Sequence, residues 1–256
     1  MGERVDVSSN LYESVTSSTT NLGSSKFYIV NSDVEITSRI TCSGNVDLIL
    51  QDGCTLTASA GITVNSGNSL TIYGQSEGTG TLNAGVGADT VDAAIGALAN
   101  NSGGTITING GIINATGPAW AAAIGGGYNG KGTVVINGGV VNASAQTIYE
   151  YEVSYEYYAD IGGVGIGGGQ RGEADVTING GTVNADGGER GAGIGSIGVP
   201  ALSQDPGKSD IKINGGKTTV SAAYGQVCVG GTAIQLLRST FRNVTALSDP
   251  PGTRER

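Results

Sequence analysis

One short phrase recurs along the second half of the chain at spacings that share a common unit. Asn-Gly-Gly begins at four positions, namely Asn109, Asn137, Asn179 and Asn214. The intervals are 28, 42 and 35 residues, so two units carry insertions of 14 and 7 residues. A second phrase, Ile-Gly, recurs with it at Ile95, Ile124, Ile166 and Ile194. A fixed period with insertions at defined places is typical of a solenoid, in which each unit packs against its neighbours.

Each unit contains three apolar segments that are too short for helices of ordinary length. The first precedes Asn-Gly-Gly and has apolar residues at alternate positions, such as Ile106 and Ile108. The second follows Gly-Gly, as in 112–115, and the third is the Ala-Ile-Gly segment. Equal positions stacked about 4.8 Å apart would form parallel sheets. The sequence therefore predicts an all-β fold, a single-stranded right-handed parallel β-helix with three short strands per turn of about 28 residues.

Glycine makes up 46 of the 256 residues, and the repeat arranges many of these glycines in columns. A corner that recurs on every turn needs a positive φ, or leaves no space for a Cβ atom, at the same place each time. The Asn-Gly-Gly asparagines form a column too, and a second column contains Asn114, Asn142 and Asn184. We interpret both columns as ladders of side-chain amides bonded from turn to turn, in preference to sugar ligands.

The repeat also suggests how the chain is divided. We expect the β-helix to span residues 26–232, with a loop inserted near 146–160. Residues 1–25 are predicted to be an N-terminal cap or a loose leader, and residues 233–256 a C-terminal cap or a non-native tail. The strands expected in the less regular N-terminal third are 27–30, 34–37, 46–50, 55–58, 62–64, 70–73 and 80–84.

Charge and composition exclude several classes of function. The formal net charge of −9 disfavours nucleic acid and anionic membranes as partners. The chain has no His, which excludes His-based metal sites and Ser-His-Asp or Cys-His catalysis. It has no apolar run long enough to span a membrane and no signal peptide after Met1, which suggests a mature N-terminus. Cys42 and Cys54 would pair only if neighbouring turns bring them together, and buried free thiols are an equal alternative.

Residues 26–231 resemble a known group of repeats. The segments SDVEITSRITCSGNVDLILQDGCTLTA and AAIGGGYNGKGTVVINGGVVNAS are similar to Gly-rich repeats of secreted or surface bacterial proteins. Those proteins are described as carbohydrate-binding and as pectate-lyase-like parallel β-helices. The resemblance implies an extracellular or cell-surface location and a polysaccharide partner. It supplies no catalytic residue.

The 14-residue insertion is the most unusual segment and the first candidate for a site. It contains half of the ten Tyr residues of the chain, interleaved with acidic residues. Trp120 and Arg190 each lie four residues before an Ile-Gly phrase, so both should approach the insertion on one flank of the helix. Flat aromatic rings beside carboxylates suit the apolar faces and hydroxyls of sugars. The predicted ligand-binding residues are Trp120, Tyr149, Tyr151, Tyr155, Tyr157 and Tyr158. An alternating Tyr/Glu hairpin that only packs on the surface is the alternative.

The same flank contains residues that would be needed for catalysis. A glycoside hydrolase would pair Asp160 with Glu150 or Glu189, and a lyase would use Arg190 or a nearby Tyr as its base. Asp175 and Asp210 should lie on adjacent turns, and this pair would need a cation, a proton or Lys212 to offset the repulsion between its like charges. Calcium, bound by Asp175 and Asp210, is therefore the one cofactor that the sequence suggests.

Three functions remain open from the sequence. The first is a carbohydrate-binding or adhesive module that recognises plant or microbial polysaccharide through the aromatic and acidic loop. The second is a polysaccharide-degrading enzyme, either a glycoside hydrolase such as an endoglucanase or a lyase. The third is a structural spacer within a larger surface protein. End-to-end or side-by-side self-association is compatible with each of them.

Overall fold

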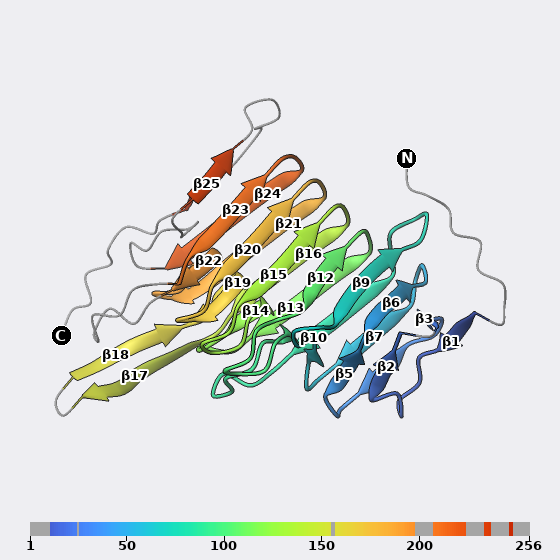
Figure 1. Cartoon of the computed structure of the whole chain (residues 1–256), viewed down its shortest axis with the longest axis horizontal. Coiled ribbons are helices and arrows are strands. Elements are labelled where there is room, and N and C mark those ends of the chain that lie inside the picture. Colours follow the sequence, from blue (N-terminus) through green and yellow to red (C-terminus); the bar gives the residue numbers. More distant parts are fainter. Residues whose placement is uncertain are drawn as a thin grey trace.

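The fold is built from β-strands stacked along one long axis (Figure 1). The computed structural model describes residues 11–24, 26–154, 157–197, 207–223, 233–236 and 246–247, and this part of the chain contains strands and no helices. It therefore offers no helix that could cross a membrane. Three parallel sheets of nine, eight and seven strands run along the axis, and we call them sheets 1, 2 and 3.

The chain visits the three sheets in a fixed order and so completes one rung, a circuit of three strands, after another. Sheet 1 contains β1 (Tyr12–Ser14), β3 (Phe27–Val30), β6 (Asn45–Leu50), β9 (Ser69–Gly74), β12 (Thr105–Ile108), β15 (Gly132–Ile136), β20 (Ala174–Ile178), β23 (Ser209–Ile213) and β25 (Ala233–Leu236). Sheet 2 contains β4 (Val34–Ile36), β7 (Thr55–Ala58), β10 (Thr81–Gly85), β13 (Ile112–Gly117), β16 (Val140–Ala145), β21 (Thr182–Glu189), β24 (Lys217–Ala223) and β26 (Ala246–Leu247). Sheet 3 contains β2 (Asn21–Gly23), β5 (Ile40–Ser43), β8 (Ile62–Thr63), β11 (Ile95–Gly96), β14 (Ala122–Gly125), β19 (Val164–Gln170) and β22 (Ile194–Ile197).

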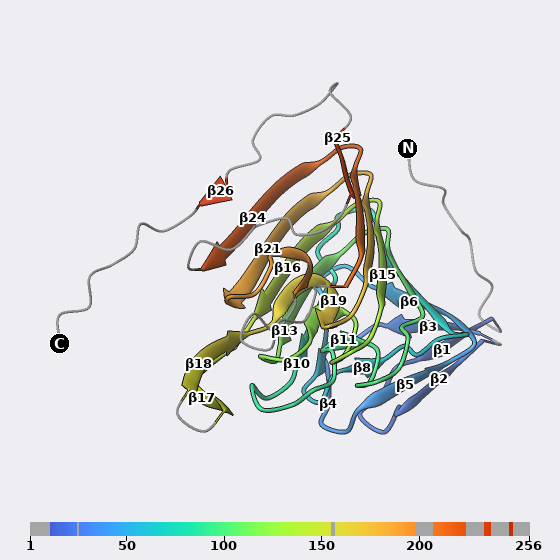
Figure 2. The ribbon, with the colours of Figure 1, turned by 60° about the vertical axis from the view of Figure 1, so that its left-hand side comes forward.

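Equivalent residues of successive rungs pair in register, as the repeat predicts. In sheet 1 Ile106 pairs with Val134 and Ile108 with Ile136, and in sheet 3 Ile124 pairs with Ile166. Figure 2 shows the strands of successive rungs stacked one behind another. The predicted fold class is therefore confirmed as a single-stranded parallel β-helix with three strands in each complete rung.

The interior is filled by columns of aliphatic side chains from alternate strand positions. One column in sheet 2 consists of Leu56, Leu82, Ile113, Val141 and Val183, which pair rung by rung. Each of these side chains is fully buried. Burying one such side chain contributes about 1.5–3 kcal/mol, so the columns supply most of the stability of a chain with few aromatic residues.

The glycine columns have the two causes expected from the sequence. The second Gly of each Asn-Gly-Gly has a φ between +82° and +85°, at Gly111, Gly139, Gly181 and Gly216. The Ile-Gly glycines, Gly96, Gly125, Gly167 and Gly195, have φ between +133° and +146°. A Cβ on Gly125 would also overlap the carbonyl oxygen of Gly167 on the next rung. These corners therefore require glycine both for backbone conformation and for space.

Both asparagine ladders are present. Nδ2 of Asn137, Asn179 and Asn214 donates to Oδ1 of the preceding asparagine at 2.7–2.8 Å, beginning at Asn109. In sheet 2 the corresponding bonds run from Asn184 through Asn142 and Asn114 to Asn83, each at 2.8 Å. Asn83 extends the second ladder by one rung beyond the sequence prediction. The ladders explain these asparagines without a ligand.

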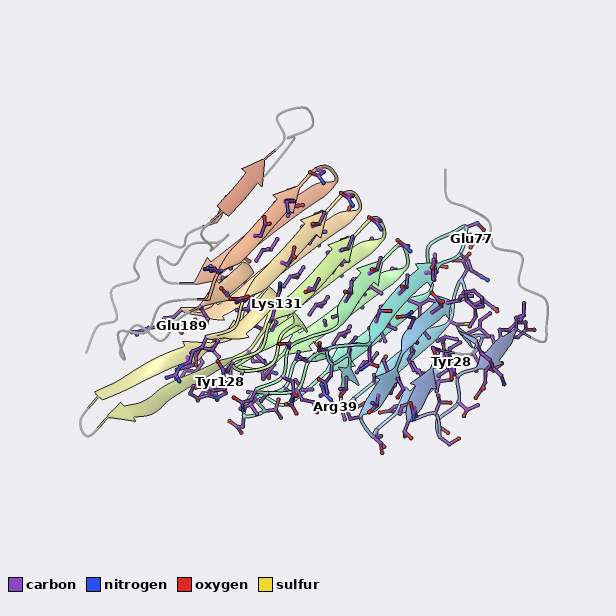
Figure 3. The ribbon with its side chains drawn as sticks, in the orientation of Figure 1. Tyr28, Arg39, Glu77, Tyr128, Lys131 and Glu189 are labelled. Atoms are coloured by element: carbon purple, nitrogen blue, oxygen red, sulfur yellow. The ribbon has the colours of Figure 1, made fainter. Side chains whose placement is uncertain are left out.

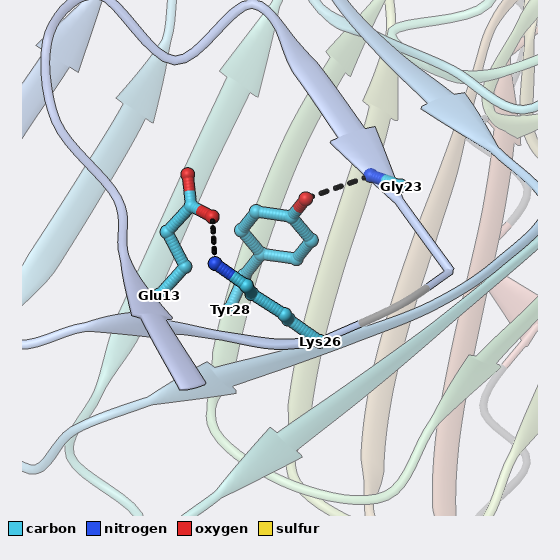
Figure 4. A network of polar contacts seen from close by, with 4 residues as sticks. All are labelled: Glu13, Gly23, Lys26 and Tyr28. Atoms are coloured by element: carbon cyan, nitrogen blue, oxygen red, sulfur yellow. Dashed lines mark hydrogen bonds and ion pairs between the residues drawn. The ribbon is translucent and has the colours of Figure 1, made fainter. Parts of the chain in front are cut away.

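The parallel pairing begins upstream of residue 26, where we had placed the start of the β-helix. Strand β1 pairs with β3, and β2 pairs with β5. The hydroxyl of the buried Tyr28 accepts a hydrogen bond from the backbone N–H of Gly23 at 2.8 Å, and Lys26 Nζ lies 3.2 Å from Glu13 Oε2 (Figure 4). Strands β1, β2 and β5 escaped the sequence analysis because they are short and largely polar.

Charged side chains tie rungs together in the N-terminal half. The Asp52 carboxylate accepts hydrogen bonds from the backbone N–H groups of Glu77 at 2.9 Å and Thr79 at 3.0 Å. These bonds hold the pKa of Asp52 below its ordinary value.

Arg39 spans three rungs at the corner between sheets 2 and 3. Its guanidinium donates to Thr63 Oγ1 at 2.7 Å and to the carbonyls of Ala60 and Ala93 at 2.9 and 2.6 Å. Desolvation by burial lowers the pKa of Arg39, and the nearby Asp92 partly opposes that shift.

The insertion near 146–160 forms an antiparallel hairpin of strands β17 (Thr147–Ser154) and β18 (Tyr157–Gly162). Figure 1 shows this hairpin projecting away from the stacked sheets. In the predicted tail, β25 pairs with β23 and β26 with β24, and the other residues from 233 onward lie outside the described part of the chain. Cys42 and Cys54 are both free, so the predicted alternative of a disulfide is wrong.

Candidate functional site

Loops fold back over the outer face of sheet 3 and create the surface on which the site lies. The loop after β14 returns so that Ala122 N–H donates to Gly126 O at 2.9 Å, and all four residues of β14 are buried. Equivalent loops stack on one another, with Asn129 N–H donating to Gln170 O at 2.8 Å. At β14 and β19 the outer face of sheet 3 is thus covered by a second layer of glycine-rich loops, whereas Thr41 and Ser43 of β5 in the same sheet are exposed.

Two aromatic rings and a guanidinium meet on this layer. The rings of Trp120 and Tyr128 form an edge-to-face pair with centroids 6.1 Å apart and an interplanar angle of 76°. Arg171 Cζ lies 5.7 Å from the centroid of the Tyr128 ring, within the range of a cation–π contact. All three side chains are half-buried. We call this group, together with Gln170, the aromatic–basic flank.

Gln170 joins the flank through its backbone and its position in the stack. Its N–H donates to Trp120 O at 3.0 Å. Because Gly125 pairs with Gly167, Gln170 occupies on its rung the place of Tyr128 on the rung before. Its side chain is only 3% exposed, and its Oε1 has no hydrogen-bond partner. The neighbouring Arg171 Nε is also buried without a partner.

Arg171 has an unusual backbone conformation for its residue type. The equivalent residues of the two preceding rungs are Asn100 and Asn129, and all three have φ between +54° and +63°. Asparagine tolerates this left-handed region better than arginine, for which it is a strained position. The flank therefore combines a strained residue, two unpartnered polar atoms and two half-exposed aromatic rings.

Of the predicted site residues, Trp120 belongs to this flank, and Glu189 and Arg190 lie beside it at the corner between sheets 2 and 3. Pairing of Ile124 with Ile166 and of Ile166 with Ile194 places Trp120 and Arg190 in one column, as expected. The root of the hairpin is held in the same corner, because Glu189 N–H donates to Thr147 Oγ1 at 2.8 Å. Figure 3 shows Tyr128 and Glu189 on the side of the β-helix from which the hairpin projects.

The predicted residues differ in how much of them the structure describes. Glu189 is 8% exposed at the hairpin root, and Tyr149 is 61% exposed on β17. Tyr155 and the side chains of Glu150, Tyr151, Tyr157, Tyr158 and Asp160 lie outside the described part of the chain. The carboxylate pairs proposed for catalysis therefore stay a prediction, as does sugar binding by the hairpin.

Asp175 and Asp210, the acidic pair predicted as a possible calcium site, have a lysine as their neighbour. Asp175 and Asp210 are register partners on adjacent strands, as predicted. Lys212 Nζ donates to Asp210 Oδ2 at 2.8 Å, and this bond, with a contribution from Asp175, raises the pKa of Lys212. The lysine thus offsets the like charges. Among the described residues no group of three or more His, Cys, Asp or Glu side chains is arranged to hold a metal ion.

Sequence reasoning missed Tyr128, Gln170 and Arg171. The signal was present in two equivalent loops, GGYNG and GGQRG, in which bulky residues interrupt glycine at the same repeat positions. Aligning Tyr128 with Gln170 and Asn129 with Arg171 would have placed them next to Trp120.

The fold and the flank together define a parallel β-helix repeat protein with an aromatic and basic surface on its third sheet. Two segments of the chain, residues 106–128 and 176–198, match a family model described as a β-helix repeat. Each segment begins in a strand of sheet 1 and runs through sheet 2 into sheet 3. No curated protein and no solved structure matches the chain significantly.

Proposed function

We propose that the chain is an extracellular carbohydrate-binding module that holds a polysaccharide against the aromatic–basic flank. The observation that carries the proposal is the grouping of Trp120, Tyr128 and Arg171 on the layer that covers sheet 3. Half-exposed aromatic rings offer apolar area to the C–H face of a sugar ring, and polar groups at their rim bond to its hydroxyls.

The shape of the scaffold supports the same function. Rungs repeat about every 4.8 Å, so a rigid array of loops presents side chains at fixed intervals along the axis. The interlocked ladders and glycine corners keep this array from rearranging, which lowers the ordering cost of binding an extended chain.

The test is retention on insoluble polysaccharides, compared between the wild-type chain and single variants. Tyr128→Ala removes the centre of the flank and should reduce retention by about 10-fold or more, the range found for aromatic anchors. Tyr149→Ala is the matched control, because this tyrosine is 61% exposed on the hairpin and outside the flank. Loss of retention in Tyr149→Ala alone would move binding to the hairpin, and no retention of wild-type chain would support the structural spacer.

The same samples address the enzymatic alternative. A hydrolase would release new reducing ends, and a lyase would release unsaturated uronate products that absorb in the ultraviolet. The binding proposal expects neither product.

A further inference from the structure

Two buried polar atoms without a hydrogen-bond partner in the described part of the chain belong to residues adjacent in the sequence, and one is an acceptor while the other is a donor. In the described residues the buried side-chain atoms without a partner are Gln170 Oε1, Arg171 Nε and Thr218 Oγ1. Gln170 Oε1 can only accept a hydrogen bond, and Arg171 Nε–H can only donate one. A buried polar group without a partner is costly, so two of them on one flank indicate that something else supplies their partners.

Both residues face the same neighbours. Arg171 lies over the ring of Tyr128, and Gln170 occupies the place of Tyr128 one rung further on. The Gln170 backbone is bonded to Trp120, which packs against Tyr128. The acceptor and the donor therefore belong to the aromatic–basic flank.

We infer that this flank is built for an uncharged sugar with neighbouring hydroxyl groups and discriminates against acidic sugars. The inference rests on the proposed function and names the class of its ligand. A hydroxyl both donates and accepts, so the hydroxyls of a sugar supply both a donor for Gln170 Oε1 and an acceptor for Arg171 Nε. A carboxylate or sulfate only accepts hydrogen bonds, so an acidic sugar that places this group at Gln170 would set two acceptor oxygens against each other.

The net charge of the chain also disfavours acidic sugars. Its formal net charge of −9 repels polyanions at a distance, and a single arginine on the flank does not reverse that field. Both unpartnered atoms are closed to solvent, so the proposal requires a side-chain rotamer of the flank to change before a ligand reaches them, which is a fast motion.

The experiment measures affinity by calorimetry for neutral and acidic hexasaccharides, namely cellohexaose, mannohexaose, xylohexaose and hexagalacturonate. The variant is Gln170→Met, which keeps the size of the side chain and removes the acceptor. We expect at least one neutral hexasaccharide to bind, hexagalacturonate to bind at least about 10-fold more weakly, and Gln170→Met to lose about 10-fold in affinity for the neutral ligand. The denaturant midpoint of Gln170→Met should be unchanged or higher, because the variant removes an unsatisfied polar atom.

The matched control is the same substitution at Gln146. Gln146 Nε2 already donates to the carbonyls of Val86 and Gly117 at 2.8 and 3.0 Å. Gln146→Met should therefore lower the denaturant midpoint and leave sugar affinity unchanged. A lower midpoint for Gln170→Met would show an internal structural role for Gln170 and overturn the inference.

The outcomes separate this inference from the proposed function. If hexagalacturonate binds as tightly as the neutral ligands, or if Gln170→Met binds like wild type while Tyr128→Ala does not bind, the ligand class is wrong and carbohydrate binding stands. If no hexasaccharide binds to the wild-type chain, both proposals fail.

Discussion

The asparagine ladder of sheet 2 makes a quantitative prediction, because its members take part in different numbers of bonds. Asn142 Nδ2 donates to Asn114, and Asn142 Oδ1 accepts from Asn184, both at 2.8 Å. Asn83 ends the ladder and only accepts, from Asn114, also at 2.8 Å. Both side chains are half-buried, so Asn142→Ala and Asn83→Ala remove two bonds and one bond from comparable surroundings.

Each such bond contributes about 1 kcal/mol net, so Asn142→Ala should lower the free energy of unfolding by about 2 kcal/mol and Asn83→Ala by about 1 kcal/mol. Unfolding in urea, followed by circular dichroism, gives both values from the shift of the midpoint if the slope is unchanged. Equal losses for the two variants, or a loss below about 0.5 kcal/mol for Asn142→Ala, would refute the ladder as a source of stability.

Three further predictions follow from other rungs. Gly67→Ala should lower the free energy of unfolding by about 1 kcal/mol, because φ is +84° and the space around a Cβ is open. Gly125→Ala should lower it by more than about 3 kcal/mol, because the added Cβ also overlaps the backbone of the next rung. Similar losses of the two variants in thermal unfolding would contradict the steric argument. Because the pKa of Asp52 is lowered in the folded state, its contribution to stability is present above the unfolded-state pKa and is lost as pH falls through the folded-state pKa. Asp52→Asn should therefore flatten the acid side of the curve of unfolding free energy against pH. An unchanged slope would contradict the role of Asp52. Burial raises the pKa of the Cys42 thiol to about 12, so iodoacetamide should alkylate the half-exposed Cys54 before Cys42, as measured by peptide mapping. Equal labelling of the two thiols in the native state would disprove the burial of Cys42.

The regular part of the fold could be predicted because its constraints are local and repeat in the sequence. Asn-Gly-Gly marks a corner with positive φ, and alternating residues such as Ile106 and Ile108 identify the inward face of a strand. In the first rungs, which contain fewer residues, the repeat is harder to recognise in the sequence. Phe27 pairs with Asp47, only 20 residues on, against 28 for Thr105 and Thr133, so the first strands carried no recognisable period.

The candidate site was predicted only in part because it depends on contacts between residues far apart in the sequence. Register alone placed Trp120 and Arg190 at one corner, since both are counted from an Ile-Gly phrase. The fold-back of the loops over sheet 3 was not encoded in the strand pattern. That fold-back brings Tyr128 and Arg171 together and buries the Gln170 side chain.

Trp120 provides the most direct test of the aromatic–basic flank, because it is the only tryptophan of the chain. Its fluorescence, excited where tyrosine does not absorb, reports on the flank alone during titration with a neutral hexasaccharide. We predict a saturable change in intensity or emission maximum that is retained in Tyr149→Ala and lost in Tyr128→Ala. Sugar binding detected by calorimetry without any change in Trp120 emission would place the ligand elsewhere and contradict the account.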